Sequence, residues 1–176
     1  MIKFTSKIFA YFLFFIFTIF LFLPKENIYF LLEKKLLTYK TIVSFEKINS
    51  NIFNFDIKNA YVFYDGIKFA KFQELKIDTY IYTNKIEMKN FTVFDGFKNI
   101  VPPKINTIEM EYKLNNPKTI DLKGEGDFGL FTGEVNLMSK KVNIFLKASK
   151  IMKRKYKNIL RQMKFKNGKY EYEYKF

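Results

Sequence analysis

The pattern of hydrophobic and polar residues changes twice along the chain, and each part predicts a different structure. Ile8–Leu23 contains sixteen residues with no charge and a single threonine. As a helix it would be about 24 Å long, slightly less than the ~30 Å hydrocarbon core of a bilayer. The stretch around Phe22–Asn27 lacks the small residues of a signal-peptidase site. We therefore predict that residues 1–24 form a short cytoplasmic tip and an uncleaved transmembrane helix.

The next sixteen residues, 25–40, have a helical period. Ile28, Leu32, Leu36 and Tyr39 fall on one stripe, with Tyr29 beside them. Pro24 precedes this stretch, and proline is favoured in a first helical turn. We predict a juxtamembrane amphipathic helix over 25–40 that packs on the domain by this stripe.

From Thr41 the period is two, which is typical of strands. Phe53, Phe55 and Ile57 alternate with polar residues, and the phase then slips at Asn59–Ala60, as a β-bulge would cause. Short turn sequences recur along the chain, among them Asp65-Gly66, Thr83-Asn84, Asp95-Gly96, Asn115-Asn116-Pro117, Ser139-Lys140 and Asn167-Gly168. Short connections make neighbouring strands antiparallel. The sequence predicts a mainly β domain over 41–176, a meander of about nine strands in a curved or grooved sheet, which Val101-Pro102-Pro103 breaks or borders with an edge.

One amphipathic helix is expected late in this domain, over 149–164, with Ser149 as its N-cap. Its apolar side consists of Ile151, Met152, Tyr156, Ile159, Leu160 and Met163. Six cations fall on the opposite side: Lys150, Lys153, Arg154, Lys157, Arg161 and Lys164. We predict that the apolar side covers the sheet and that these six cations contact an anionic partner or lipid.

Most of the net positive charge of the chain lies in and around this helix. The formal net charge is +14, and residues 139–176 alone contain 13 basic and 2 acidic side chains. Such a basic amphipathic helix allows three interpretations: a solvated outer face, a contact for anionic lipid or an acidic protein, or a contact for nucleic-acid phosphates. The pattern alone leaves all three open, with nucleic acid the least favoured.

The sequence gives no sign of catalysis. The chain has no histidine and no cysteine, so imidazole bases, thiol nucleophiles and the commonest zinc ligands are absent. Gly124–Gly129 fits the G-x-G-x-x-G pattern, but an alternating, strand-like stretch follows it instead of the helix that a dinucleotide site requires. The carboxylates at Glu109, Glu111, Glu171 and Glu173 are interpreted as solubilising charges. We predict a protein that is not an enzyme and that holds no cofactor or metal.

The order of elements resembles that of type II secretion system protein N, and through it the AsmA-like proteins. The segments that carry the resemblance are the strand pairs of residues 53–94, the glycine-rich pair GEGDFGLFTGEVNL at 124–137, and the closing ILRQMKFKNGKYEYEYKF at 159–176. The resemblance implies a non-catalytic accessory component of a type II secretion-like or DNA-uptake machine. Such a protein would be anchored once in the bacterial inner membrane, with its C-terminal domain in the periplasm, and would act by contacts with other proteins.

Two alternatives accompany this prediction. The AsmA-like resemblance implies a lipid-binding or lipid-transfer module, which requires a continuous apolar groove lined by phenylalanine and isoleucine. The basic helix suggests instead a membrane-anchored DNA-binding domain, whose affinity would fall steeply with salt.

Overall fold

The computed structural model describes Tyr11 and residues 25–51, 54–80 and 82–176. The predicted anchor over Ile8–Leu23 lies outside these residues, apart from Tyr11. Among the helices of the described part, none combines the length and the apolar composition needed to cross a bilayer.

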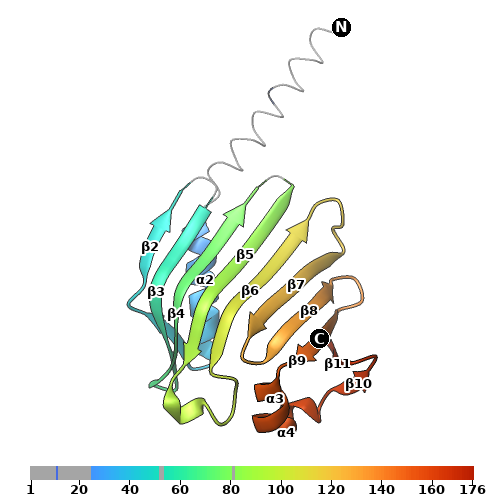
Figure 1. Ribbon diagram of the computed structural model, residues 1–176. Helices are drawn as coiled ribbons and strands as arrows, with labels where there is room; N and C mark the ends of the chain where they lie inside the picture. Colours follow the sequence, from blue (N-terminus) through green and yellow to red (C-terminus); the bar gives the residue numbers. More distant parts are fainter. Residues whose placement is uncertain (1–10, 12–24, 52–53, 81) are drawn as a thin grey trace, which may run out of the picture.

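The described chain folds into one antiparallel sheet of 11 strands, which confirms the predicted mainly β class (Figure 1). The strands are β1 (Thr41–Ser44), β2 (Lys47–Ser50), β3 (Asn54–Tyr64), β4 (Ile67–Thr79), β5 (Thr83–Val93), β6 (Lys104–Lys113), β7 (Thr119–Gly126), β8 (Gly129–Asn136), β9 (Lys141–Ala148), β10 (Lys164–Lys166) and β11 (Lys169–Lys175). Their order in the sheet is β1-β3-β4-β5-β6-β7-β8-β9-β11-β10, and β2 pairs with β3 beyond the end of β1. Most neighbours in the sheet are therefore neighbours in the chain, as short hairpin connections require.

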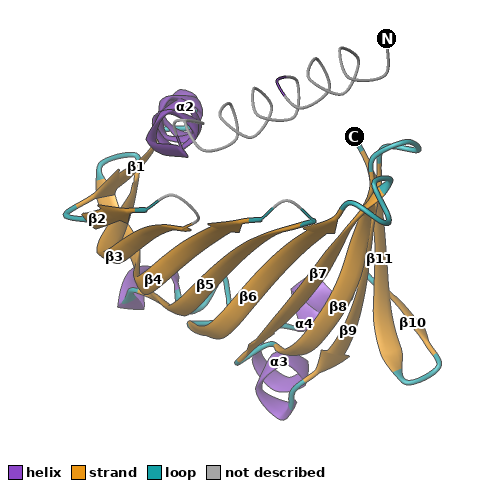
Figure 2. Cartoon of the chain, turned by 90° about the horizontal axis from the view of Figure 1, so that it is seen from above, coloured by secondary structure: helices purple, strands orange, loops and turns teal. Residues whose placement is uncertain are grey.

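The helix predicted over 25–40 is confirmed as α2 (Lys25–Thr38), which lies against the β1–β3 end of the sheet (Figure 2). Tyr29 is only 3% exposed, and Leu36 packs beside it on the first core cluster. The prediction that Tyr39 belongs to the packing stripe is wrong, because Tyr39 follows the end of α2 and is 65% exposed. The side chains of Ile28 and Leu32 lie outside the described part of the molecule.

The connection between β5 and β6 differs from the prediction. Asp95-Gly96 does not form a tight hairpin turn but opens a 3-10 helix, η1 (Asp95–Phe97), in a long loop that ends at Pro103. The two prolines lie in this loop, and β5 and β6 pair directly beside it. Val101-Pro102-Pro103 therefore neither breaks the sheet nor makes an edge, because both prolines precede β6 and no N–H of theirs is required: Pro103 only accepts a hydrogen bond of 2.8 Å from the Val93 N–H.

The single helix predicted over 149–164 is also wrong. The segment forms two short helices, α3 (Lys150–Lys155) and α4 (Lys157–Leu160), and Lys164 already belongs to β10. The break is at Tyr156, whose φ of −116° and ψ of 39° are not helical. Like charges four residues apart, such as Lys153 and Lys157, destabilise a continuous helix here. The predicted N-cap is confirmed, because the Ser149 hydroxyl accepts a hydrogen bond of 3.0 Å from the backbone N–H of Met152.

Two core clusters lie at opposite ends of the sheet. The first joins α2 to β1 and β3–β5, with Tyr29, Val43, Phe55, Ile57, Ala60 and Phe72 at its centre. The second joins α3 and α4 to β8, β9, β11 and the turn between β7 and β8, with Leu146, Met152, Tyr156 and Leu160 at its centre. The strands between them follow an arc that opens toward the side on which α2 lies (Figure 2).

Candidate functional site

The two core clusters belong to one continuous apolar face of the sheet. Directly paired residues in antiparallel strands point to the same side. One row of such pairs runs from the first cluster to the second: Ile57, Leu75, Met88, Ile108, Gly124, Phe131, Leu146 and Tyr170. The apolar surface is therefore shared by β3 to β9 and β11.

Beside that row, the next two rows of directly paired residues contribute ten apolar side chains that belong to neither cluster and keep part of their surface exposed. We call them the open apolar face: Ile86, Met110, Tyr112, Ile120, Leu122, Val135, Val142, Ile144, Tyr172 and Tyr174. Ile86 is 38%, Tyr172 39% and Tyr174 53% exposed. The five spacings of about 4.8 Å between its six strands and four residues of about 3.3 Å along each strand give this face a size of roughly 24 Å by 13 Å.

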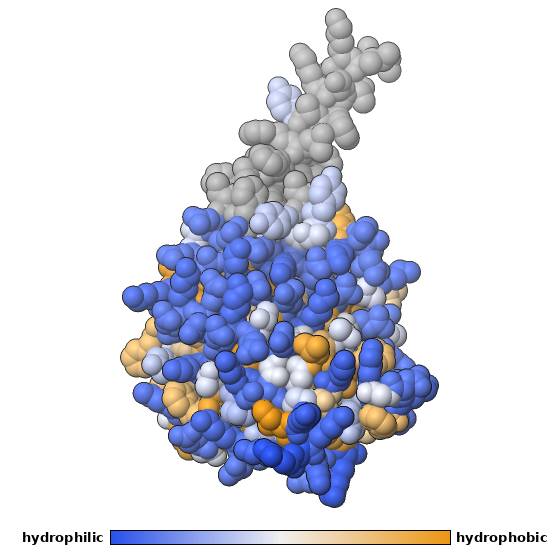
Figure 3. All heavy atoms as spheres, viewed as in Figure 1, coloured by the Kyte–Doolittle hydropathy of each residue, from blue (hydrophilic) through white to orange (hydrophobic). Residues whose placement is uncertain are grey.

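The opposite face of the sheet is polar, as Figure 3 shows over the central strands. Ion pairs between neighbouring strands cover much of it. Lys89 Nζ lies 3.2 Å from Glu74 Oε2, and Lys85 Nζ lies 3.2 Å from Glu109 Oε2. The pKa of Lys89 is raised, first by its hydrogen bond to Glu74 and then by the charge of Glu87. The carboxylates of Glu109, Glu111 and Glu173 all take part in ion pairs with lysines, so they are more than solubilising charges.

Three of the six predicted cations gather at one place. Lys153, Lys157 and Arg161 line a hollow of about 300 Å³ together with Leu160 and Tyr170. These three cations are exposed, and none forms an ion pair with an acid of the described chain. Lys150, Arg154 and Lys164 are also exposed but do not line this hollow.

The floor of this hollow connects the cations to the apolar face. Leu160 is a buried member of the second core cluster, and Tyr170 packs on that cluster from β11. Tyr172 and Tyr174 follow Tyr170 on the same side of β11, within the open apolar face. The hollow therefore combines positive charge with an apolar surface that continues for about 13 Å along the strand.

The glycine-rich motif has a packing role. Gly124 and Gly126 lie within β7 and Gly129 begins β8, so the motif forms a strand, a tight turn and a strand. A β-carbon at Gly124 would overlap the ring of Phe131, and Gly129 has a φ of +111°. The glycines are thus required by side-chain packing and by the turn.

No group of three or more metal-ligating acids that could hold an ion occurs among the residues described. The chain matches no protein-family model, and no curated protein or solved structure is significantly similar to it. The resemblance to type II secretion system protein N therefore stays a prediction from the sequence.

Proposed function

We propose that this protein binds an anionic lipid, with acyl chains on the open apolar face and the headgroup at Lys153, Lys157 and Arg161. The observation that supports this most directly is the hollow that these three cations line together with Leu160 and Tyr170. A protein that bound only phosphates would not need an apolar floor. A protein that bound only hydrocarbon would not need unpaired cations beside it.

The dimensions of the open apolar face suit this ligand. One leaflet of a bilayer contributes about half of the ~30 Å hydrocarbon core, so an extended acyl chain covers about 15 Å. The face is about 13 Å long in the strand direction and wide enough, at roughly 24 Å, for more than one chain side by side. All ten of its side chains are aliphatic or aromatic, so chains lying on it would leave water without exposing a charge.

The experiment uses the full-length chain in detergent micelles and two fluorescent lipids with identical acyl chains, phosphatidylglycerol and phosphatidylcholine. We expect both lipids to bind, and the anionic one to bind at least tenfold more tightly. The triple variant Lys153→Gln, Lys157→Gln and Arg161→Gln should lose this preference but still bind phosphatidylcholine. The matched control, Lys118→Gln, Lys140→Gln and Lys166→Gln, removes the same charge from exposed positions that do not line this hollow and should keep the preference.

A second pair of variants tests the apolar face. Leu122→Gln together with Ile144→Gln should weaken the binding of both lipids equally. Leu130→Gln, on the opposite side of β8, should change the affinity for neither. Binding of neither lipid by the wild-type chain would overturn the proposal. In that case a photoreactive residue at position 122 that crosslinks to residues 8–23 would identify the chain's own apolar segment as the occupant.

The roles in a secretion or DNA-uptake machine and in DNA binding stay predictions. Genes for a secretin, an assembly ATPase and pseudopilins beside this gene would support the first. For the second, duplex DNA binding that the Lys153, Lys157 and Arg161 substitutions abolish is the expected result, and unchanged binding would contradict it.

A further inference from the structure

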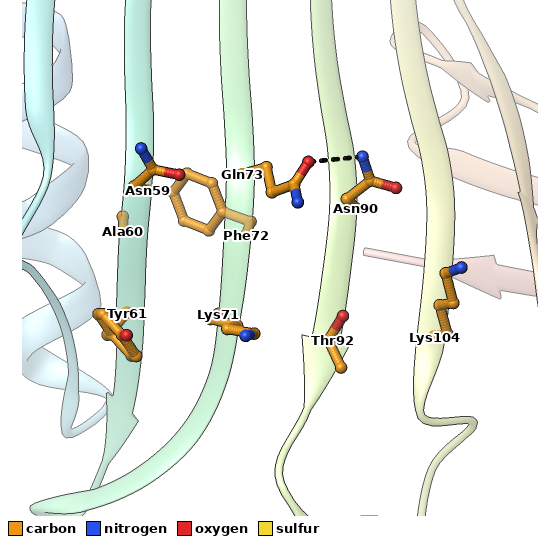
Figure 4. A pocket seen from close by; sticks show the side chains of 9 residues that line it. All are labelled: Asn59, Ala60, Tyr61, Lys71, Phe72, Gln73, Asn90, Thr92 and Lys104. Carbon is orange, nitrogen blue, oxygen red and sulfur yellow. Dashed lines mark hydrogen bonds between the residues drawn. The ribbon is translucent and has the colours of Figure 1, made fainter.

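A row of amide side chains crosses the polar face of the sheet. Asn59 of β3, Gln73 of β4, Asn90 of β5 and Asn106 of β6 each lie between two pairs of the strand registers, which brings them to one level of the sheet. Asn90 Nδ2 donates a hydrogen bond of 2.8 Å to Gln73 Oε1 (Figure 4). We call Asn59, Gln73, Asn90 and Asn106 the amide row.

The backbone is irregular at the amide row in a way that keeps it on the polar side. Asn59 and Asn90 have positive φ values of 56° and 52°, and the register shifts next to Asn106. In β3 the apolar alternation stops at Ile57 and resumes at Ala60, so two consecutive residues leave the apolar face. Asparagine tolerates a positive φ better than other side-chain-bearing residues, and such positions collect at functional sites.

The amide row borders a hollow of about 560 Å³. Asn59, Gln73 and Asn90 lie along one side of it (Figure 4). The next row of directly paired residues, Tyr61, Lys71, Thr92 and Lys104, lies along the other. Its volume is in the range of small-molecule sites, and it lies on the side of the sheet away from the proposed lipid surface.

The two lysines of this hollow have no acidic partner in the described part of the chain. Lys71 and Lys104 are exposed and form no ion pair with any acid in the described part of the chain. On the other side of the amide row, Lys76, Lys85, Lys89 and Lys113 all pair with carboxylates. Unlike these four lysines, Lys71 and Lys104 line the hollow without an acidic partner.

We propose that this hollow binds a sugar that carries an anionic group, either a phosphate or a carboxylate. Primary amides both donate and accept hydrogen bonds, which is what vicinal sugar hydroxyls require, and the Thr92 hydroxyl lines the other side of the hollow. Lys71 and Lys104 supply the positive charge for the anionic group. Inorganic phosphate would leave the amides unused, and a neutral sugar would leave the lysines unused.

The test uses the full-length chain in a polyoxyethylene detergent, which contains neither sugar nor phosphate. Calorimetric titration compares a glucose phosphate monoester, glucuronate, glucose and inorganic phosphate at low salt. We expect the phosphate ester or glucuronate to bind at least tenfold more tightly than glucose and than inorganic phosphate. Whichever of the two binds more tightly identifies the source of the anionic group.

Substitutions separate the two parts of the site. Lys71→Gln with Lys104→Gln should weaken the binding of the anionic sugar at least tenfold. Gln73→Met should lower the affinity for the anionic sugar to that for inorganic phosphate. Lys118→Gln with Lys140→Gln is the charge-matched control. Thermal unfolding of each variant checks that the fold is retained, and a Gln73→Glu variant, which keeps the size of the side chain, should repel the ligand if Gln73→Met fails to fold.

Equal affinity for inorganic phosphate and the sugar phosphate would overturn the proposal, as would the absence of binding by all four compounds. Tighter binding of a single-stranded oligonucleotide, lost in the same lysine variant, would assign the hollow to nucleic acid instead. Because the Lys153, Lys157 and Arg161 substitutions do not touch this hollow, either result is independent of the lipid experiment.

Discussion

The hydroxyl of Tyr156 donates a hydrogen bond to the backbone carbonyl of Lys98, a residue 58 positions earlier in the chain. This bond joins the break between α3 and α4 to the loop that follows η1. Tyr156 is only 4% exposed, so the bond is shielded from water. It explains why the helix is interrupted at a tyrosine whose ring also belongs to the second core cluster.

Tyr156→Phe keeps the ring in the core cluster but leaves the Lys98 carbonyl without this donor. We expect the free energy of unfolding to fall by about 1 kcal/mol, the usual value for a shielded neutral hydrogen bond. Urea unfolding of the full-length chain in detergent measures the difference. Tyr174→Phe, at a position 53% exposed, is the control and should change nothing measurable. Equal effects of the two substitutions would contradict the role of this bond.

The stability of the first core cluster should depend on pH in the alkaline range. Burial raises the pKa of Tyr29, and the nearby charges of Glu46 and Glu33 raise it further. The folded protein therefore keeps the phenolic proton above pH 10, where the unfolded chain releases it. Since the unfolded state then binds fewer protons, the free energy of unfolding decreases as pH rises above 10, by at most about 1.4 kcal/mol per pH unit.

Tyr29→Phe isolates this effect, because all other titrating groups are common to both proteins. The difference in unfolding free energy between wild type and variant should be constant below pH 9 and shift in favour of the variant above pH 10. The Tyr64→Phe variant, changed at a site 51% exposed, provides the comparison and should follow the wild type throughout. A wild type and a Tyr29→Phe variant with parallel profiles would show that Tyr29 titrates as it does in the unfolded chain.

Gly124→Ala tests the packing role of the glycine-rich motif. The added β-carbon would overlap the ring of Phe131, so we expect a loss of about 1–3 kcal/mol, as for overpacking in other cores. Gly96→Ala is the matched control, since nothing lies within 4 Å of the added carbon there. Combining Gly124→Ala with Phe131→Leu should cost less than the sum of the two single changes. Additive effects would mean that the two residues do not compete for the same space.

The positive φ of Asn90 predicts an unusual order of substitutions within a strand. Asn90→Ala should cost about 1 kcal/mol because a β-carbon disfavours this region, whereas Asn90→Gly should cost less. At Asn84, in the same strand with no positive φ, the order should be reversed, because glycine weakens a regular strand. Thermal unfolding of the four variants decides this, and the same order at both positions would contradict a left-handed Asn90.

Local pattern was enough to predict the meander, since alternation and turn residues are properties of short segments. It was also enough to predict that Lys153, Lys157 and Arg161 share one side, because their spacing of four is preserved across the break at Tyr156. The break itself was not predictable: Met152, Tyr156 and Leu160 have the spacing of an unbroken helix, and the partner of Tyr156 lies far away in the chain.

The amide row of the sheet also could not be predicted from local pattern, because it depends on how different strands align. The phase slip at Asn59–Ala60 was predicted as a bulge, but the β3–β4 register is the same on both sides of it and shifts only between Val62 and Phe63. Gln73, Asn90 and Asn106 are each one extra polar residue in their own strand, so the neighbouring strands slip together. They become a feature only when the strand registers bring them to one level. Which lysines lack an acid across the strand is likewise decided by register, so the hollow beside Lys71 and Lys104 could not be predicted from the sequence.

The chain-order pairing of the strands has a consequence for folding cooperativity. From β4 to β8 every described strand pairs only with the strands before and after it, and each core cluster has its own helices at its own end of the sheet. In such a nearly one-dimensional arrangement, stability is close to a sum of neighbour terms, and one end can open while the other stays folded. A ligand lying across the open apolar face would contact both halves at once and would make them unfold as a single unit.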